Sequence, residues 1–545
     1  MESTPARRHS LSTMLRRSTA RHGKATAIAC GEVEWSYAEF DNVVDRLSAG
    51  LALRGVEQGD RVAICARNSH AFMAVRFAVA RLAAILVPVN FMLKAEEVRY
   101  VLEHSGARVL FLDATTIDVG LEAAAGCVEA IYGLPGEKCP APDAERAPNW
   151  EALLIEAPRR SEIADQADIA QIIYTSGTES RPKGAALSHG AILWQYQSCI
   201  VDCEWTSETV ALHTMPLFHC AQLDAMIGPA LSVGAKNIIT AHPSAENIIG
   251  LLDRYKISSF FAPPTIWIAL LRSPLIEQRD FSHLTKGYYG ASIMPVEVIR
   301  ELRRRLPKLR LWNLYGQTEI APVATILFPE EHAQRLGSAG RATLHVETRV
   351  VDENMCDAAV GEVGEIVHRS PQLMTTYWND PQRTAEAFAG GWFHSGDLAV
   401  ADTDGYLTIV DRKKDMIKTG GENVSSREVE EAIYRCPEVR EVAVVGLPDP
   451  KWVEAVTAFV VRRDGSSCDE ETIINHCSTH LAVFKVPRRV IFLQTLPKNA
   501  SGKILKRDLR LLAYTPSLED TSLSRSAEFN SAINSNDPDY DNRHR

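Results

Sequence analysis

The chain has 545 residues and a mass of 60.2 kDa, which is too long for one ordinary hydrophobic core, so two or more domains are expected. Hydrophobic residues make up 46% of it and charged residues 23%, a composition typical of a folded globular protein. The formal net charge of −10 argues against a nucleic-acid-binding protein, which normally presents a basic surface. No run approaches the ~18–20 apolar residues that cross a bilayer.

The eleven cysteines are too sparse for a disulfide scaffold. Cys199 and Cys203 have no second pair at zinc-ligand spacing, so we expect reduced thiols in a cytoplasmic protein. Residues 1–23 are rich in Arg and almost free of acidic residues, which resembles an organelle transit peptide. Leu11, Met14 and Leu15 stand at helical spacing, however, and favour an ordinary first helix packed on the domain.

Strand-like and amphipathic segments alternate along most of the chain. The pattern predicts strands at 61–66, 84–89, 109–112, 237–240 and 258–262, and helices at 71–82, 95–104 and 245–255. Such alternation predicts parallel sheets covered by helices. Between about 346 and 410 the segments become short strands with Gly and Asp turns, which predicts a small β-rich subdomain.

A charged run, DRKKD at 411–415, separates two hydrophobic blocks and predicts a domain boundary, although such runs are also common on solvated surfaces. Beyond it we expect a helix at 426–434, strands at 441–446 and 455–461, and a helix at 470–481. From about 514 onward Ser, Asn and Asp dominate, which is typical of disorder. The expected parts are therefore an N-terminal domain over 1–411, a C-terminal domain over 412–513 and a disordered tail over 514–545.

The first segment that indicates a binding function is 172–185. Here an apolar strand leads into a Thr-, Ser- and Gly-rich loop that ends in Pro-Lys-Gly. Hydroxyls and free backbone N–H groups can surround phosphate oxygens, and a lysine adds a point charge. The loop lacks the Gly-Lys-Ser/Thr of kinases and ATPases. By itself it is also compatible with a Gly/Pro-rich surface loop.

Four further segments carry polar groups far away along the chain. They are LYGQTE at 314–319, GWFHSGD at 391–397, DGYLTIVDR at 404–412 and LPKNASGKILK at 496–506. Together with 172–185 these make five segments. In this order along the chain they resemble the adenylate-forming superfamily of acyl-CoA synthetases, luciferases and peptide-synthetase adenylation domains, and the resemblance covers about residues 10–512. The segments 215–219 and 420–424 are similar to those of bacterial fatty-acyl-CoA ligases.

The resemblance implies an α/β fold. A large N-terminal domain of parallel, helix-covered sheets with a small β-rich subdomain would precede a smaller, mobile α+β domain. It also implies ATP, Mg²⁺ and CoA as ligands. The residues that would border the β- and γ-phosphates are Thr175, Ser176, Gly177, Thr178 and Lys183. Those that would face the adenine are Gly290, Ala291, Ser292 and Tyr315.

Further roles follow from the same resemblance. Asp397 and Arg412 would bind the ribose hydroxyls, Thr318 would touch the α-phosphate, and Glu319 would hold Mg²⁺. Lys503 resembles the catalytic lysine of the first half-reaction, and Lys414 resembles the pivot about which the C-terminal domain turns. That turn would bring Lys418 and Asn423 to the site for thioester formation. The acid is expected to contact His219 and Gln222, although His219 is equally compatible with a packed, hydrogen-bonded histidine.

The implied chemistry explains these groups. A carboxylate is a poor electrophile, so its attack on the α-phosphorus of ATP, which releases pyrophosphate, activates it as an acyl-AMP. Charge builds on the phosphoryl oxygens, where Mg²⁺ and Lys503 would stabilise it. CoA thiolate would then displace AMP. Two departures stand out, because this family usually has Gly where this chain has Ser180 and Val453.

Several alternatives stay open. The expected substrate is a short- or medium-chain fatty acid, and an aryl acid is the alternative. An acyl-AMP ligase that loads a carrier protein, in place of free CoA, is the competing enzyme. A nucleotide-binding pseudoenzyme is the competing class, although the retained Glu319, Asp397, Arg412 and Lys503 argue against it. The oligomeric state is open between a monomer and a homodimer.

Overall fold

The computed structural model describes residues 5–156, 163–175, 182–290, 294–498 and 504–514. The chain divides into two units, Met1–Lys414 with Lys498–Lys503, and Asp415–Pro497 with Ile504–Arg545. The division falls after Lys414, within the charged run 411–415 at which the sequence predicts a boundary. The predicted tail over 514–545 lies, except for Tyr514, outside the described residues. Within the described ranges no helix is long and apolar enough to span a membrane.

The first unit contains a seven-stranded sheet in the order β18-β8-β7-β4-β3-β5-β6. The strands are β3 (Arg61–Cys65), β4 (Ile85–Pro88), β5 (Ala107–Leu112), β6 (Ala130–Gly133), β7 (Ile169–Thr175), β8 (Lys183–Ser188) and β18 (Thr376–Tyr377). Strands β3 to β7 pair in parallel, whereas β8 and β18 are antiparallel additions at one edge. The edge of this sheet therefore departs from the expected parallel arrangement, because β7 turns straight back into β8.

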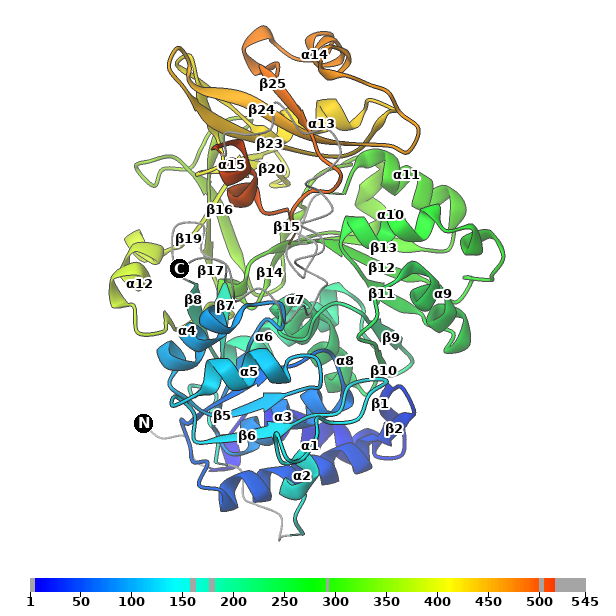
Figure 1. The fold of residues 1–545 in the computed structure, drawn as a ribbon, viewed down its shortest axis with the longest axis vertical. Helices are drawn as coiled ribbons and strands as arrows, with labels where there is room; N and C mark the ends of the chain where they lie inside the picture. The colour runs from blue at the N-terminus through cyan, green and yellow to red at the C-terminus, as the bar shows by residue number, and fades with distance from the viewer. Residues whose placement is uncertain (1–4, 157–162, 176–181, 291–293, 499–503, 515–545) are drawn as a thin grey trace, which may run out of the picture. The chain divides into compact units, whose positions relative to one another are not determined.

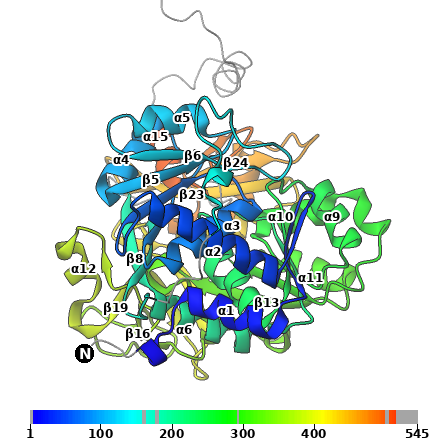
Figure 2. The same cartoon turned by 90° about the horizontal axis from the view of Figure 1, so that it is seen from below.

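Helices cover both faces of this sheet. They are α2 (Tyr37–Leu53), α3 (His70–Arg81), α4 (Ala95–Ser105) and α5 (Ile117–Ala124). Alternate residues of the buried strand β3 point to opposite faces. Val62 and Ile64 pack in one core with α2 and α3, and Ala63 and Cys65 pack in another with α4 and α5. The first helix, α1 (Leu11–His22), lies against α2 and α3, as Figure 2 shows.

A second sheet of nine strands has the order β15-β14-β13-β12-β11-β9-β10-β1-β2. Its strands are β1 (Thr26–Cys30), β2 (Val33–Ser36), β9 (Val210–His213), β10 (Lys236–Ile239), β11 (Ser259–Phe261), β12 (Lys286–Gly290), β13 (Arg310–Gly316), β14 (Val323–Leu327) and β15 (Arg341–Ala342). The central strands are parallel, and β2, β14 and β15 are antiparallel.

Helices α9 (Ala245–Arg254), α10 (Pro264–Arg272) and α11 (Val296–Arg305) cover the outer face of the second sheet (Figure 1). On its other face lie α6 (His189–Asp202) and α8 (Gly228–Val233). Both helices also contribute to the core of the first sheet, so they form a shared layer. A short helix, α7 (Cys220–Gln222), and a π-helical turn (Leu223–Ile227) lead into α8.

A four-stranded antiparallel sheet follows in the first unit, where the β-rich subdomain is expected. Its strands are β16 (Glu347–Val351), β17 (Val363–Arg369), β19 (Phe393–Ala401) and β20 (Leu407–Arg412). Helix α12 (Pro381–Ala387) connects β18 to β19.

The second unit is an α+β fold around the strands β21 (Ile417–Thr419), β22 (Glu422–Val424), β23 (Val439–Asp449), β24 (Val453–Arg462) and β25 (Arg489–Phe492). Helices α13 (Ser426–Tyr434) and α14 (Glu470–Ser478) cover one face, and α15 (Lys506–Tyr514) packs on the other through Leu509. The helix expected at 470–481 ends earlier, at Ser478.

Candidate active site

The predicted phosphate loop joins two paired strands. Thr175 ends β7 and Lys183 begins β8, and the two residues lie directly opposite each other in the antiparallel ladder. Ser176, Gly177 and Thr178 lie outside the described residues. The hairpin therefore holds the two ends of the loop together at the margin of the first sheet.

Lys183 and Glu319 are connected through an aromatic ring. The ammonium of Lys183 lies 5.0 Å from the centre of the Tyr377 ring, at cation–π distance. The Tyr377 hydroxyl donates a hydrogen bond of 2.8 Å to Oε1 of Glu319. Burial, followed by the nearby Glu319 carboxylate, raises the pKa of Tyr377 well above its ordinary value, so the hydroxyl stays protonated.

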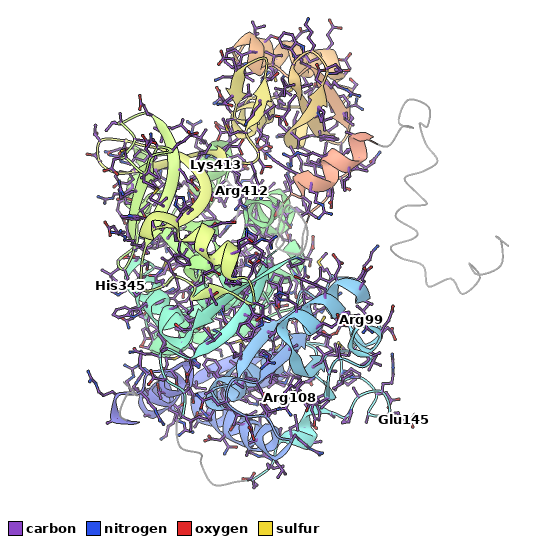
Figure 3. All side chains as sticks on the ribbon, turned by 90° about the vertical axis from the view of Figure 1, so that its left-hand side faces the viewer. Arg99, Arg108, Glu145, His345, Arg412 and Lys413 are labelled. Carbon is purple, nitrogen blue, oxygen red and sulfur yellow. The ribbon has the colours of Figure 1, made fainter. Side chains whose placement is uncertain are left out.

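A second cluster links the end of β13 to the small sheet. The Tyr315 hydroxyl donates to Oδ2 of Asp397 at 2.7 Å, and Nε of Arg412 lies 3.1 Å from Oδ1 of the same carboxylate. Asp397 and Arg412 face each other across β19 and β20. Figure 3 labels Arg412, the last residue of β20, and Lys413, which follows the strand. Burial and the Asp397 charge raise the pKa of Tyr315 well above its ordinary value, which keeps it a donor.

Gly290 ends β12 beside β13 and is paired with Leu314. A Cβ atom at this position would lie 2.3 Å from the Leu314 carbonyl oxygen, so the strand pairing requires glycine here. Ala291 and Ser292, expected beside it, lie outside the described residues.

Thr318 contacts the predicted acid-binding segment. It is buried, and its hydroxyl is 3.3 Å from Sγ of Cys220. His219 is half-buried at the start of α7, where its Nδ1 accepts from the Ala221 N–H at 3.3 Å. Burial raises the pKa of the Cys220 thiol well above its ordinary value, so this thiol stays neutral beside Thr318.

Gln222 is fully buried, in contrast to the half-buried His219. Its Oε1 accepts from the Met215 N–H at 3.1 Å, and its Nε2 lies 2.6 Å from Nδ1 of His213. Both ends of the amide therefore tie the end of α7, where Gln222 lies, to the end of β9 and the segment that follows it.

In the second unit, the predicted thioester-forming residues lie on a β-hairpin. Lys418 and Asn423 are exposed and directly opposite each other in β21 and β22. Gly420 and Gly421 form the turn with φ of 60° and 88°, values that favour glycine. The Lys418 N–H donates to Oε2 of Glu454 at 2.6 Å. Lys414 is the last residue of the first unit's main segment, and Lys503 lies outside the described residues.

Val453 begins β24 with a φ of 71°, in the left-handed region that a β-branched residue rarely adopts. Its side chain is 69% exposed, so no packing holds it there. The conformation accounts for the glycine that is usual at this position of the hairpin.

Comparisons with known proteins identify the family of this chain. Residues 15–378 match the model of the AMP-binding enzyme family, and residues 428–503 match that of the AMP-binding enzyme C-terminal domain. The chain belongs to the AMP-binding enzyme family.

Curated relatives of this AMP-binding enzyme are CoA ligases of different acids. Feruloyl-CoA synthase from Amycolatopsis is 36% identical and covers 89% of this chain and 95% of its own. Indoleacetate–CoA ligase from Aromatoleum aromaticum is 35% identical, with 91% and 97% covered. The long-chain-fatty-acid–CoA ligase FadD13 of Mycobacterium tuberculosis is 34% identical, with 88% and 93% covered.

Among solved structures, ATP-bound MatB from Rhodopseudomonas palustris superimposes with a TM-score of 0.85 at 27% identity, covering 93% of this chain and 99% of MatB. The chain is accordingly an AMP-forming acid–CoA ligase of α/β fold.

The metal site expected in this AMP-binding enzyme rests on one carboxylate. In the described ranges no group of three or more His, Cys, Asp or Glu side chains gathers to hold a metal. Mg²⁺ in nucleotide sites is commonly held by one or two carboxylates together with substrate phosphates. Glu319, with one oxygen bonded to Tyr377, fits that donor set.

Sequence reasoning missed Tyr377. It belongs to none of the five segments and lies 58 residues after Glu319 in the chain. Its only sequence signal is a short aromatic pair, Tyr377-Trp378, before an Asn-Asp-Pro turn. The pairing of β18 with β8 is what brings it to the site.

Proposed function

We propose that this acid–CoA ligase activates its acid between the two residue clusters at the end of β13. The observation that carries the proposal is the spacing of Tyr315, Thr318 and Glu319 along one strand end and the turn after it. Tyr315 is bonded to Asp397 on one side, and Glu319 is bonded through Tyr377 towards Lys183 on the other. The adenosine and the phosphates of one ATP molecule are likewise at opposite ends, so one cluster would bind the adenosine and the other the phosphates.

In the first half-reaction, Asp397 would accept hydrogen bonds from the ribose hydroxyls, and Arg412 would hold that carboxylate in place through its ion pair. Lys183 and the hydroxyl of Thr175 would bind the β- and γ-phosphates, with Ser176, Gly177 and Thr178 between them. Thr318 would donate to the α-phosphate, and Lys503 would stabilise the charge that grows as the carboxylate attacks. Bound Mg²⁺ on Glu319 would neutralise charge on the phosphate oxygens.

In the second half-reaction, the second unit would present the hairpin that carries Lys418 and Asn423. The division of the chain after Lys414 supports a pivot at that residue. This rotation of the second unit would withdraw Lys503 from the active site, so that the same site serves two different steps. CoA thiolate would attack the acyl carbonyl, and AMP would leave.

For the acid, an aromatic carboxylic acid of the size of ferulate or indoleacetate is the first candidate. Phe218, next to His219, packs edge-to-face on Phe91 with ring centres 5.5 Å apart. Such a pair offers a ring edge to a flat aromatic substrate. The two relatives named for aromatic acids support the same choice. A medium-chain fatty acid, the expectation from sequence, is the second candidate and is favoured by the likeness to FadD13.

Pyrophosphate release over a panel of acids tests both the overall reaction and the identity of the acid. Ferulate, cinnamate, indoleacetate, hexanoate and octanoate would each be offered with ATP, Mg²⁺ and CoA. We expect the aromatic acids to give the highest kcat/KM, and a tenfold preference for octanoate would reverse the choice of substrate. Acyl thioester formed only on a carrier protein, and never on CoA, would refute CoA as the acceptor. No pyrophosphate release with any acid would favour a pseudoenzyme.

The Phe218→Ala variant gives a sharper test of the acid. It should raise the KM for an aromatic acid by roughly 3- to 10-fold, since an aromatic pair contributes about 0.5–1.5 kcal/mol. The KM for ATP should stay unchanged. An equal rise for aromatic and aliphatic acids would show that the ring pair does not select between them.

A further inference from the structure

The segment from Met374 to Tyr377 makes two hydrogen bonds to Glu319. The Met374 N–H donates to the backbone carbonyl of Glu319 at 2.7 Å, and the Tyr377 hydroxyl donates to its carboxylate at 2.8 Å. Both bonds come from one short stretch of chain, so the backbone and the side chain of Glu319 are held together. A lone hydrogen bond to the carboxylate would fix the side chain far less.

Tyr377 is itself held rigidly. It is 5% exposed, and its residue pairs with Ala185 in β8. Its N–H donates to Oγ1 of Thr384 at 3.0 Å, which ties it to α12. Because a strand and a helix hold its backbone and its side chain is buried, Tyr377 cannot easily change its direction, so its hydroxyl is a fixed donor.

Lys183 contacts the ring of Tyr377 as well. Lys183 and Ala185 lie on one face of β8 because they are two residues apart, and Tyr377 pairs with Ala185. Tyr377 is therefore the diagonal neighbour of Lys183 across the ladder, which places the ammonium 5.0 Å from the ring centre. In the part of the chain that the structure describes, Lys183 has no carboxylate partner and Oε2 of Glu319 has no protein partner.

We propose that Tyr377 is a positioning residue that orients the Glu319 carboxylate towards Mg²⁺ and holds the Lys183 ammonium apart from it. The inference rests on the proposed roles of Glu319 and Lys183. The hydroxyl occupies Oε1 and leaves Oε2 for the cation, while the ring keeps Lys183 from closing an ion pair on Glu319. The hydroxyl thus orients Glu319 for Mg²⁺, and the ring keeps Lys183 available to bind phosphates.

The two parts of the side chain can be separated. Tyr377→Phe removes only the hydroxyl, and Tyr377→Leu removes the ring as well. Tyr406→Phe is the matched control, because Tyr406 also donates to a glutamate, Glu331, away from these residues. Glu319→Gln tests the metal role itself. ATP binding to each full-length variant is measured by calorimetry, without acid and therefore without turnover, in EDTA and at increasing Mg²⁺.

In Tyr377→Phe, we expect the Mg²⁺ concentration for half-maximal enhancement of ATP binding to rise by about 10-fold or more, as for other residues that orient a metal ligand. ATP affinity in EDTA should stay within two-fold of wild type. Tyr377→Leu should show the same change in Mg²⁺ requirement and lose a further roughly two- to five-fold in EDTA, because the cation–π contact is absent. Tyr406→Phe should bind as wild type does.

An unchanged Mg²⁺ requirement in Tyr377→Phe, with a raised one in Glu319→Gln, would overturn the inference and leave the metal role of Glu319 standing. An unchanged requirement in Glu319→Gln would overturn both. An equal shift in Tyr406→Phe would also overturn the inference, since the effect would then be general. The Phe variant keeps the buried ring, so the test does not depend on whether the Leu variant folds.

Discussion

The hydroxyl of Tyr315 lies 2.7 Å from one oxygen of Asp397, and Nε of Arg412 lies 3.1 Å from the other. A carboxylate held between a neutral donor and a guanidinium keeps its orientation. It can accept hydrogen bonds from paired hydroxyls without first having to reorganise.

Asp397→Ala should raise the KM for ATP by about 10- to 150-fold, because hydrogen bonds to a charged group are worth about 1.5–3 kcal/mol. The KM for the acid should change little. Steady-state pyrophosphate release at varied ATP measures both. Asp404→Ala is the control, since Asp404 pairs with Arg335 at an exposed turn of the same region. A KM for ATP within two-fold of wild type in Asp397→Ala would contradict the assigned role.

Lys503→Ala should slow acyl-AMP formation by about 10²–10³-fold, the usual cost of removing one electrostatic stabiliser of a transition state. ATP binding should survive. The control is within the same variant: thioester formation from synthetic acyl-AMP and CoA should proceed at nearly the wild-type rate. If both half-reactions fall equally, Lys503 does not serve adenylation alone.

Val453→Gly should stabilise the second unit. A non-glycine residue in a strained φ region costs about 1–3 kcal/mol, which exceeds the roughly 0.4–1 kcal/mol that glycine adds through unfolded-state freedom. We expect a higher free energy of unfolding, measured by urea titration.

Val363→Gly is the matched control for Val453→Gly. Val363 is also exposed at the start of a strand, β17, but it is absent from the residues with positive φ. This change should destabilise the protein by roughly 0.5–1 kcal/mol. If both variants lose stability, Val453 is not strained.

A buried ion pair lies in the layer between the sheets. Arg76 of α3 pairs with Asp224 at 2.6 Å, and both side chains are almost fully buried. Gln171 of β7 and Tyr196 of α6 complete the cluster. Asp224→Ala should lower the free energy of unfolding by about 3–5 kcal/mol, because it leaves Arg76 buried without its partner.

The surface pair of Glu297 and Arg300 provides the comparison, since both side chains are exposed. Glu297→Ala should cost less than about 1 kcal/mol. The double variant Arg76→Met/Asp224→Leu should be more stable than Asp224→Ala, as expected when both buried charges are removed together. A small effect of Asp224→Ala would show that water or rearrangement compensates for the lost carboxylate.

The elements that could be predicted have local signals. The helix expected at 426–434 is α13 (Ser426–Tyr434), and the strand expected at 61–66 is β3 (Arg61–Cys65). Apolar periodicity and turn residues act within a few positions, so such elements can be read from short windows. Edge strands such as β18, with two residues, carry no such signal and were missed.

The chain order of the polar segments determined that this protein resembles adenylate-forming enzymes, and it identified Asp397, Arg412 and Glu319 by their places in those segments. Only the tertiary structure decided which of these residues share a contact. Gln222 lies in a recognisable segment, yet it is buried and bonded to Met215 and His213. Tyr377 lies in none, yet strand pairing brings it between Lys183 and Glu319. Local pattern specifies the type of each element, whereas contacts between residues far apart in the chain depend on how the sheets assemble.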